Sequence, residues 1–135
     1  GGGRWQLASR GPGPEAPWPP PQTVFLDRDQ VTFPLEVRHF REGDRFWPRG
    51  APWPKKLQDF LVDRKIPRWL RHHLPLVVAT GTIVWVAGLE VAESAKVTPA
   101  SRSLLEITVF PNEARTRRVW EVLQACRRRL LNQSR

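Results

Sequence analysis

The stretch that decides the fold is residues 76–87, LVVATGTIVWVA. Both halves are rich in β-branched residues, and Thr80-Gly81 between them is typical of the tight turn that joins two antiparallel strands. We therefore predict a β-hairpin with strands over residues 76–79 and 82–87. This hairpin places an antiparallel sheet in the fold.

Further strands are expected on both sides of the hairpin. Apolar residues alternate with polar ones over residues 34–40 and 104–110, which is the period of a half-buried strand. Residues 23–26 form another candidate strand, and residues 4–9 a short one that would be the end of something upstream. Residues 45–54 hold three prolines, one glycine and two tryptophans, so we expect an ordered loop there.

Two short helices are expected between these strands. In residues 55–65, Leu57, Phe60 and Leu61 are spaced for one apolar helix face. Pro67 ends this helix and can begin a second one that runs to about residue 74.

A longer helix is expected at the end of the chain, from an Asn112 cap to about residue 131. Its apolar residues are spaced 4, 3 and 4 and predict one buried stripe, made of Val119, Leu123, Cys126 and Leu130. The predicted fold class is therefore α+β, with a small mixed or antiparallel sheet packed against short helices and a C-terminal helix.

The composition describes a basic chain of one-domain size. Its 135 residues include 22 Lys and Arg against 13 Asp and Glu, a net charge of +9. The single cysteine, Cys126, excludes a disulfide framework and a four-ligand zinc site, and we expect a reducing, cytoplasmic location. The longest apolar run, residues 74–78, is too short to span a bilayer, so no membrane partner is expected.

Proline content suggests how the chain is divided. Six of the twelve residues from 11 to 22 are proline, which favours an extended linker. We expect residues 1–10 to be the end of an upstream region or a tail, residues 23–110 a domain, and residues 111–135 a basic helix. The chain contains no Met even at position 1, so we expect it to be part of a longer protein; whether residues 1–3 are native stays open.

Catalytic and metal-binding motifs are missing from the sequence. Neither a phosphate-binding lysine loop nor an H-E-x-x-H zinc motif occurs. His72 and His73 are adjacent and would point about 100° apart on a helix, so they cannot share a metal. We expect them to be a surface or RNA-facing pair, and His39 to lie half-buried on a strand. Asp59 and Asp63 could form an acid–base pair, but pairing with Lys55 or Lys56 on one helix face is favoured.

Basic residues concentrate between positions 38 and 73, where ten Lys or Arg stand against four Asp or Glu. Such a surface neutralises phosphates, and tryptophans beside it can stack on unpaired bases. Trp47 and Trp53 are candidates for this role. Core packing is the alternative, which we favour for Trp53 and Trp69, while Trp47 is balanced between the two. A second cluster of arginines, at positions 115–129, is typical of a solvated helix face.

A series of short motifs, in order along residues 24–110, resembles the C-terminal domain of bacterial tRNA(Ile) lysidine synthetase. The matching segments are LEVR (35–38), REGDR (41–45), PRG (48–50), KKLQDF (55–60), IP (66–67), Arg71, LPL (74–76), VWVAG (84–88) and KVTP (96–99). The chain departs from the pattern at Trp53-Pro54, where many relatives carry Gly or Ser. The terminal helix lies outside it.

The resemblance implies a function for the parent enzyme. The family uses ATP, with magnesium, to join lysine to the wobble cytidine of tRNA(Ile), and its catalytic N-terminal domain carries an S-G-G-x-D-S loop that is absent here. The C-terminal domain is non-catalytic, binds the tRNA acceptor stem, and is similar in fold to a module of the phenylalanyl-tRNA synthetase β chain. This fragment alone is therefore expected to have no catalytic residues, cofactor or metal.

The RNA-binding residues expected on this basis combine the matching basic positions with their neighbours. They are Arg38, Arg41, Arg45, Arg49, Lys55, Lys56, Arg68, Arg71 and Trp47. Gly43 and Gly50 would serve turns, and Asp44 would hold its own loop. Expected partners are the acceptor stem of tRNA(Ile) and the catalytic domain of the same chain. The alternatives are an interaction module that forms a homodimer through the terminal helix, and an autonomous enzyme, against which the missing phosphate loop argues.

Overall fold

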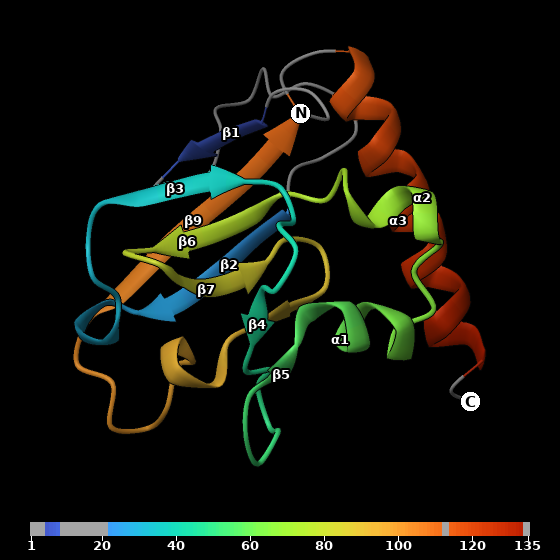
Figure 1. Cartoon of the computed structure of the whole chain (residues 1–135). Coiled ribbons are helices and arrows are strands. Elements are labelled where there is room, and N and C mark those ends of the chain that lie inside the picture. The colour runs from blue at the N-terminus through green and yellow to red at the C-terminus, as the bar shows by residue number, and fades with distance from the viewer. Residues whose placement is uncertain (1–4, 9–21, 112–113, 134–135) are drawn as a thin grey trace.

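A computed structural model of the chain describes residues 5–8, 22–111 and 114–133. Its strands form a four-stranded sheet, a three-stranded sheet and a two-stranded ribbon, all paired antiparallel. The α-helices gather along one side of the sheets (Figure 1). The predicted α+β class with antiparallel sheets is confirmed.

The four-stranded sheet is built around the predicted hairpin, which consists of β6 (Leu76–Ala79) and β7 (Thr82–Val86). Thr80 and Gly81 have φ angles of 46° and 85°, and positive φ at both positions is what a type I′ turn requires. β3 (Leu35–Arg38) pairs with β6, and β8 (Glu90–Val91) pairs with β7. β3 is shorter at both ends than the predicted strand 34–40.

The three-stranded sheet has β9 (Leu104–Pro111) at its centre, between β1 (Trp5–Ala8) and β2 (Gln22–Asp27). All four residues of β1 pair with β9, so this segment, which we expected to end an upstream region, adds a strand to the same sheet. Two short 3-10 helices, η1 (Arg28–Gln30) and η2 (Glu93–Ala95), follow β2 and β8. The predicted linker, residues 11–22, lies outside the described residues except for Gln22.

A two-stranded ribbon of β4 (Arg45–Phe46) and β5 (Lys55–Lys56) precedes the short helices. The prediction that a helix begins at Lys55 was wrong, and α1 spans Leu57–Asp63. The Leu57 N–H donates to the Asp44 carbonyl (2.9 Å), so the strand pairing continues up to the first helical residue. α2 (Arg68–Arg71) is also shorter than predicted.

The C-terminal helix α3 (Ala114–Gln133) packs against β9. Val119, Leu123 and Cys126 are buried, as the spacing predicted, whereas Asn112 and the Leu130 side chain lie outside the described part. Trp120 is buried as well, with its ring centroid 5.7 Å from that of Trp5. No helix among the described residues is long and apolar enough to cross a membrane.

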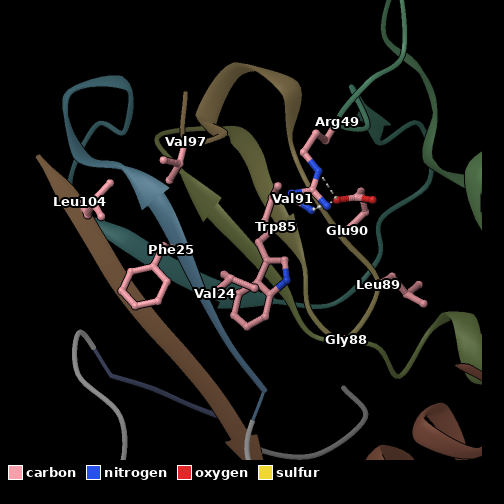
Figure 2. A pocket seen from close by; sticks show the side chains of 10 residues that line it. All are labelled: Val24, Phe25, Arg49, Trp85, Gly88, Leu89, Glu90, Val91, Val97 and Leu104. Atoms are coloured by element: carbon pink, nitrogen blue, oxygen red, sulfur yellow. Dashed lines mark hydrogen bonds and ion pairs between the residues drawn. The ribbon is translucent and has the colours of Figure 1, made fainter. Parts of the chain in front are cut away.

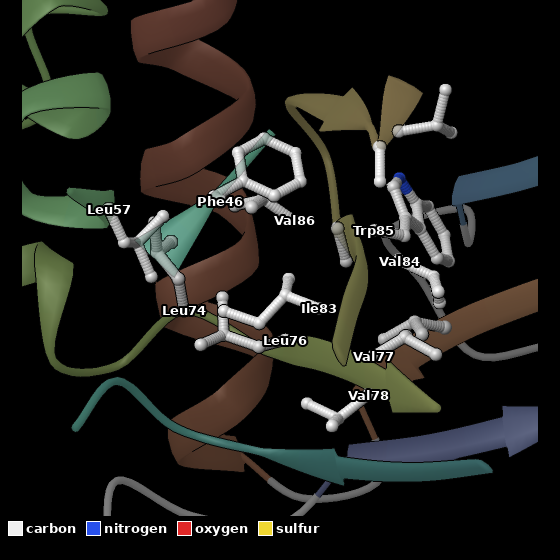
Figure 3. Packing of buried hydrophobic residues seen from close by; sticks show 14 of the residues in the cluster. Phe46, Leu57, Leu74, Leu76, Val77, Val78, Ile83, Val84, Trp85 and Val86 are labelled. Atoms are coloured by element: carbon white, nitrogen blue, oxygen red, sulfur yellow. The ribbon is translucent and has the colours of Figure 1, made fainter. Parts of the chain in front are cut away.

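The central hairpin is covered on both faces, because all four residues of β6 and four of the five in β7 are buried. On one side Leu76, Ile83 and Leu74 lie toward Phe46 and Leu57 of β4 and α1 (Figure 3). Trp85 and Val77 lie on the other side, toward β2 and β9. The hairpin therefore forms the centre of the core and fixes the ribbon and α1 against it.

Candidate nucleic-acid interface

The β4–β5 ribbon holds two cations side by side. Arg45 lies directly opposite Lys56, and Phe46 directly opposite Lys55. Opposite residues of an antiparallel pair project on the same face. Phe46 is buried, so Arg45 and Lys56 share the outer face, where both are exposed. Like charges directly opposite each other destabilise a strand pair, and a bound anion would relieve this repulsion.

The loop before β4 is fixed by Asp44. Its carboxylate accepts two hydrogen bonds of 2.9 Å from the Arg38 guanidinium and one of 2.8 Å from the Arg41 backbone N–H. Burial alone would raise the pKa of Asp44, but these bonds outweigh it and lower the pKa below the ordinary 3.8. Gly43 has φ of 89° in this turn. The prediction that Asp44 holds its own loop is confirmed.

Internal partners occupy four of the predicted RNA-binding cations. Arg38 binds Asp44, Arg49 pairs with Glu90 (3.2 Å), Lys55 pairs with Asp63 (2.7 Å), and Arg71 Nε donates to the Ile66 carbonyl (3.0 Å). The other four, Arg41, Arg45, Lys56 and Arg68, are exposed and make no ion pair within the described part of the chain. Arg45 makes a long, exposed hydrogen bond of 3.4 Å to the Pro54 carbonyl, which leaves its charge unpaired. Among the predicted residues, these four are the cations available to an external polyanion.

The available cations fall into two places. Arg41, Arg45 and Lys56 belong to the ribbon and the loop before it, and we call these three residues the ribbon cations. Arg68 lies on α2, which is set apart from β4 and β5 in Figure 1. The structure therefore divides the predicted patch, and the ribbon holds the denser part of the unpaired charge.

The tryptophans differ from their predicted roles. Trp47, for which exposure and core packing were balanced, is half-buried, and its indole N–H donates to the Ala51 carbonyl at 2.8 Å. Trp53 and Trp69, for which core packing was favoured, are 69% and 56% exposed. Trp53 stands between Pro52 and Pro54, and this P-W-P pattern is a sequence signal for an exposed loop position that the prediction of core packing did not take into account.

A family model described as the TilS substrate C-terminal domain matches residues 35–107. The chain belongs to this family. The matched range of the TilS C-terminal domain begins in β3 and ends in β9, so it contains the ribbon and both short helices. The strands β1 and β2 and the helix α3 lie outside it.

Curated relatives of the chain include proteins named tRNA(Ile)-lysidine synthase. The protein from Symbiobacterium thermophilum is 47% identical over 67% of this chain and 19% of its own length. The protein from Geobacter sulfurreducens is 34% identical over 81% of this chain and 25% of its own length. The chain thus spans about a fifth to a quarter of these relatives.

Two solved structures are similar to the chain, and the first of them supports the same assignment. A crystal structure of a TilS C-terminal domain matches with a TM-score of 0.57 and 26% identity, covering 82% of this chain and 83% of that one. An N-terminal fragment of the phenylalanyl-tRNA synthetase β-subunit from Pyrococcus horikoshii matches with a TM-score of 0.53 and 14% identity, covering 78% of this chain and 33% of that one. The second similarity concerns the fold alone.

The carboxylates of the described residues bear on whether acid–base or metal chemistry was predicted correctly. No group of three or more His, Cys, Asp or Glu in the described residues could hold a metal ion. Asp63 pairs with Lys55 of β5, and this bond lowers the pKa of the Asp63 carboxyl. Asp63 does pair with a lysine, but the prediction that they share a helix face was wrong, because Lys55 lies on β5. A carboxylate held ionised in this way is unsuited to act as a general acid.

A half-buried histidine should make stability depend on pH. Burial, together with the nearby His73, lowers the pKa of His39 below the ordinary 6.5, and its Nε2 is buried without a hydrogen-bond partner among the described residues. The unfolded chain therefore binds the proton first, and the free energy of unfolding should rise with pH up to about 6.5 and then level off. Urea titrations across this range should show a smaller rise for His39→Gln. An unchanged profile in that variant, or an equal change in the exposed control His72→Gln, would contradict the assignment.

Proposed function

We propose that this chain binds the acceptor stem of tRNA(Ile), as the C-terminal domain of a tRNA(Ile)-lysidine synthase. The observation that carries the proposal is the Arg45–Lys56 pair, two like charges held opposite each other on an exposed ribbon. Membership of the TilS family makes a tRNA the first polyanion to consider.

The chemistry of the ribbon suits an RNA duplex. An A-form stem has a major groove too deep and narrow for side chains to read, so contacts to phosphates and sugars dominate its recognition. Arg41, Arg45 and Lys56 are exposed cations that can each make a contact of this kind. Such contacts position the RNA without reading its sequence.

The rest of the proposed activity belongs to the longer protein. The chain matches 19% and 25% of the length of the two relatives above. Both relatives are named tRNA(Ile)-lysidine synthase. We propose a parent ligase of the cytoplasm that uses ATP and magnesium to join lysine to the wobble cytidine, with this domain holding the acceptor stem beside a catalytic domain of the same chain.

Single substitutions of the ribbon cations test the RNA-binding role. Arg45→Ala and Lys56→Ala should each weaken binding of an acceptor-stem hairpin about fivefold to tenfold at roughly 0.1 M salt, because each removes about one phosphate contact. Each should also reduce the slope of log K against log salt by about one unit. Fluorescence anisotropy over a salt series measures both quantities.

An exposed arginine away from the ribbon is the matched control. Arg102→Ala removes the same charge beside Asp27, Asp29 and Glu93, where an RNA would meet acidic groups, and it should leave affinity and slope unchanged. If Arg45→Ala and Lys56→Ala bind the hairpin like the unmodified chain, the ribbon is not the interface.

The alternative function, an interaction module that dimerises through α3, gains no support from the fold. In the described part of the predicted stripe, Val119, Leu123 and Cys126 are all buried in the chain's own core. Those apolar side chains are therefore already covered and cannot meet a second copy.

A further inference from the structure

Trp53 takes no part in the phosphate contacts proposed for the ribbon cations. Its side chain is 69% exposed, the largest exposed fraction of any large apolar residue in the described part of the chain. None of the ring contacts or cation–π contacts found among the described residues involves Trp53. The exposed face of the indole is available to a ligand. Covering it would be favourable, because a large apolar surface would be removed from water.

The loop that carries Trp53 is held in place on both sides. The Trp47 indole donates to the Ala51 carbonyl (2.8 Å), and the Gly50 N–H donates to the Glu93 carboxylate (2.7 Å). Gly50 adopts a φ of 84°, which a side chain would disfavour. Pro52 and Pro54 restrict the backbone on either side of the indole. The ring is therefore presented from a preorganised loop, which reduces the entropy lost on stacking.

This indole lies beside the ribbon cations. Trp53 is three residues before Lys56, a span of about 10 Å along an extended chain. Arg45 reaches the same turn, where its guanidinium donates to the Pro54 carbonyl at 3.4 Å. The loop between β4 and β5 projects away from the sheets (Figure 1). A ligand held by Arg45 and Lys56 would thus have the indole at its side.

We propose that Trp53 stacks on an unpaired nucleobase at the end of an RNA duplex whose phosphates the ribbon cations hold. Within a duplex, neighbouring bases cover both faces of each base, so an indole can stack only on a terminal or unpaired base. A tRNA acceptor stem provides such bases in the single-stranded segment at its 3′ end, next to duplex phosphates. This inference rests on the proposed RNA binding and adds a contact that distinguishes the end of the stem.

An aromatic cavity elsewhere in the described part of the chain lacks these properties. A cavity of about 480 Å³ lies between β2, β7 and β8 and is lined by Phe25, Trp85 and Leu104 (Figure 2). Trp85 is only 1% exposed, so its ring offers no free face. Arg49, the cation at this cavity, is paired with Glu90. Nothing there combines an open ring with unpaired positive charge.

The test compares two RNA hairpins with the same stem. One carries a four-nucleotide single-stranded 3′ extension and the other ends blunt. The unmodified 135-residue chain should bind the extended hairpin at least about fivefold more tightly, since stacking on one base contributes about 1–3 kcal/mol. Trp53→Ala should lose this preference and bind the blunt hairpin like the unmodified chain, whereas Trp53→Phe, which keeps an aromatic face, should retain most of it.

Trp69→Ala is the matched control, because Trp69 is also exposed but lies on α2. It should keep the preference for the extension. The inference is overturned if the unmodified chain shows no preference, if Trp53→Ala keeps it or weakens both hairpins equally, or if Trp69→Ala loses it. In each of these cases, if the affinity for the hairpins still depends on Arg45 and Lys56, the proposed RNA binding would stand. Failure of the unmodified chain to bind either hairpin at low salt would overturn both proposals.

Discussion

Replacing Trp120 by alanine should lower the free energy of unfolding by about 3–5 kcal/mol. Trp120 is 1% exposed, and its ring packs edge-on against Trp5 of β1 at 5.7 Å between centroids. Alanine would leave a cavity between α3 and the three-stranded sheet. A domain of this size has about 5–15 kcal/mol of stability in total, so the loss should be visible as a large fall in the urea midpoint.

Trp69→Ala is the control for this substitution, since Trp69 is more than half exposed and its removal should change stability by about 0.5 kcal/mol or less. Equal effects of the two substitutions would mean that α3 does not hold the core. The result matters for the family, because α3 lies beyond the matched range 35–107. We expect it to behave as an integral part of this domain.

Replacing Asp44 by alanine should cost about 2–4 kcal/mol of stability and weaken RNA binding as well. The side chains of Arg38 and Asp44 are only 14% and 11% exposed, so losing the carboxylate leaves a largely buried guanidinium without an opposite charge and with only the His39 carbonyl as acceptor. The Arg41 N–H loses its acceptor at the same time. The loop that leads into Arg45 would then be less well ordered.

Urea denaturation and hairpin binding measure the two effects of Asp44→Ala. Glu42→Ala is the control, because Glu42 is exposed in the same loop and makes no ion pair among the described residues. Since the pKa of Asp44 is lowered, its stabilising contribution is complete above about 3.8, the ordinary value, and is lost as the pH falls through the folded-state pKa. The difference from the unmodified chain should therefore shrink in acid. A loss no greater than that of Glu42→Ala would contradict this role.

The sequence predicted the parts of the fold that depend on local signals. The hairpin of β6 and β7 was found because a turn and two β-rich segments are adjacent. Lys55 and Lys56 were misassigned to a helix because their strand partners, Phe46 and Arg45, lie about ten residues away and leave no local signal. Helix periodicity was correct only from Leu57 onward, where the strand pairing ends.

The sequence predicted the site as a region, and the structure shows which cations in that region have internal partners. Composition alone located the positive charge between residues 38 and 73. It could not show that Arg49 is paired with Glu90, which is 41 positions away, or that Arg38 is occupied by Asp44. Trp47 and Trp53 differ in burial because of how the loop folds onto Ala51 and Glu93, a tertiary effect. Pairing in three dimensions therefore decides which cations remain available.

The Arg45–Lys56 pair also bears on how this domain can be improved by design. Design for the stability of the unbound chain alone would place Asp or Glu at one of the two positions, because opposite charges stabilise a cross-strand pair. The same change would remove a proposed phosphate contact. Selection for thermal robustness and selection for affinity thus oppose each other at this pair, and a hyperstable version of the domain should keep both cations and gain its stability elsewhere.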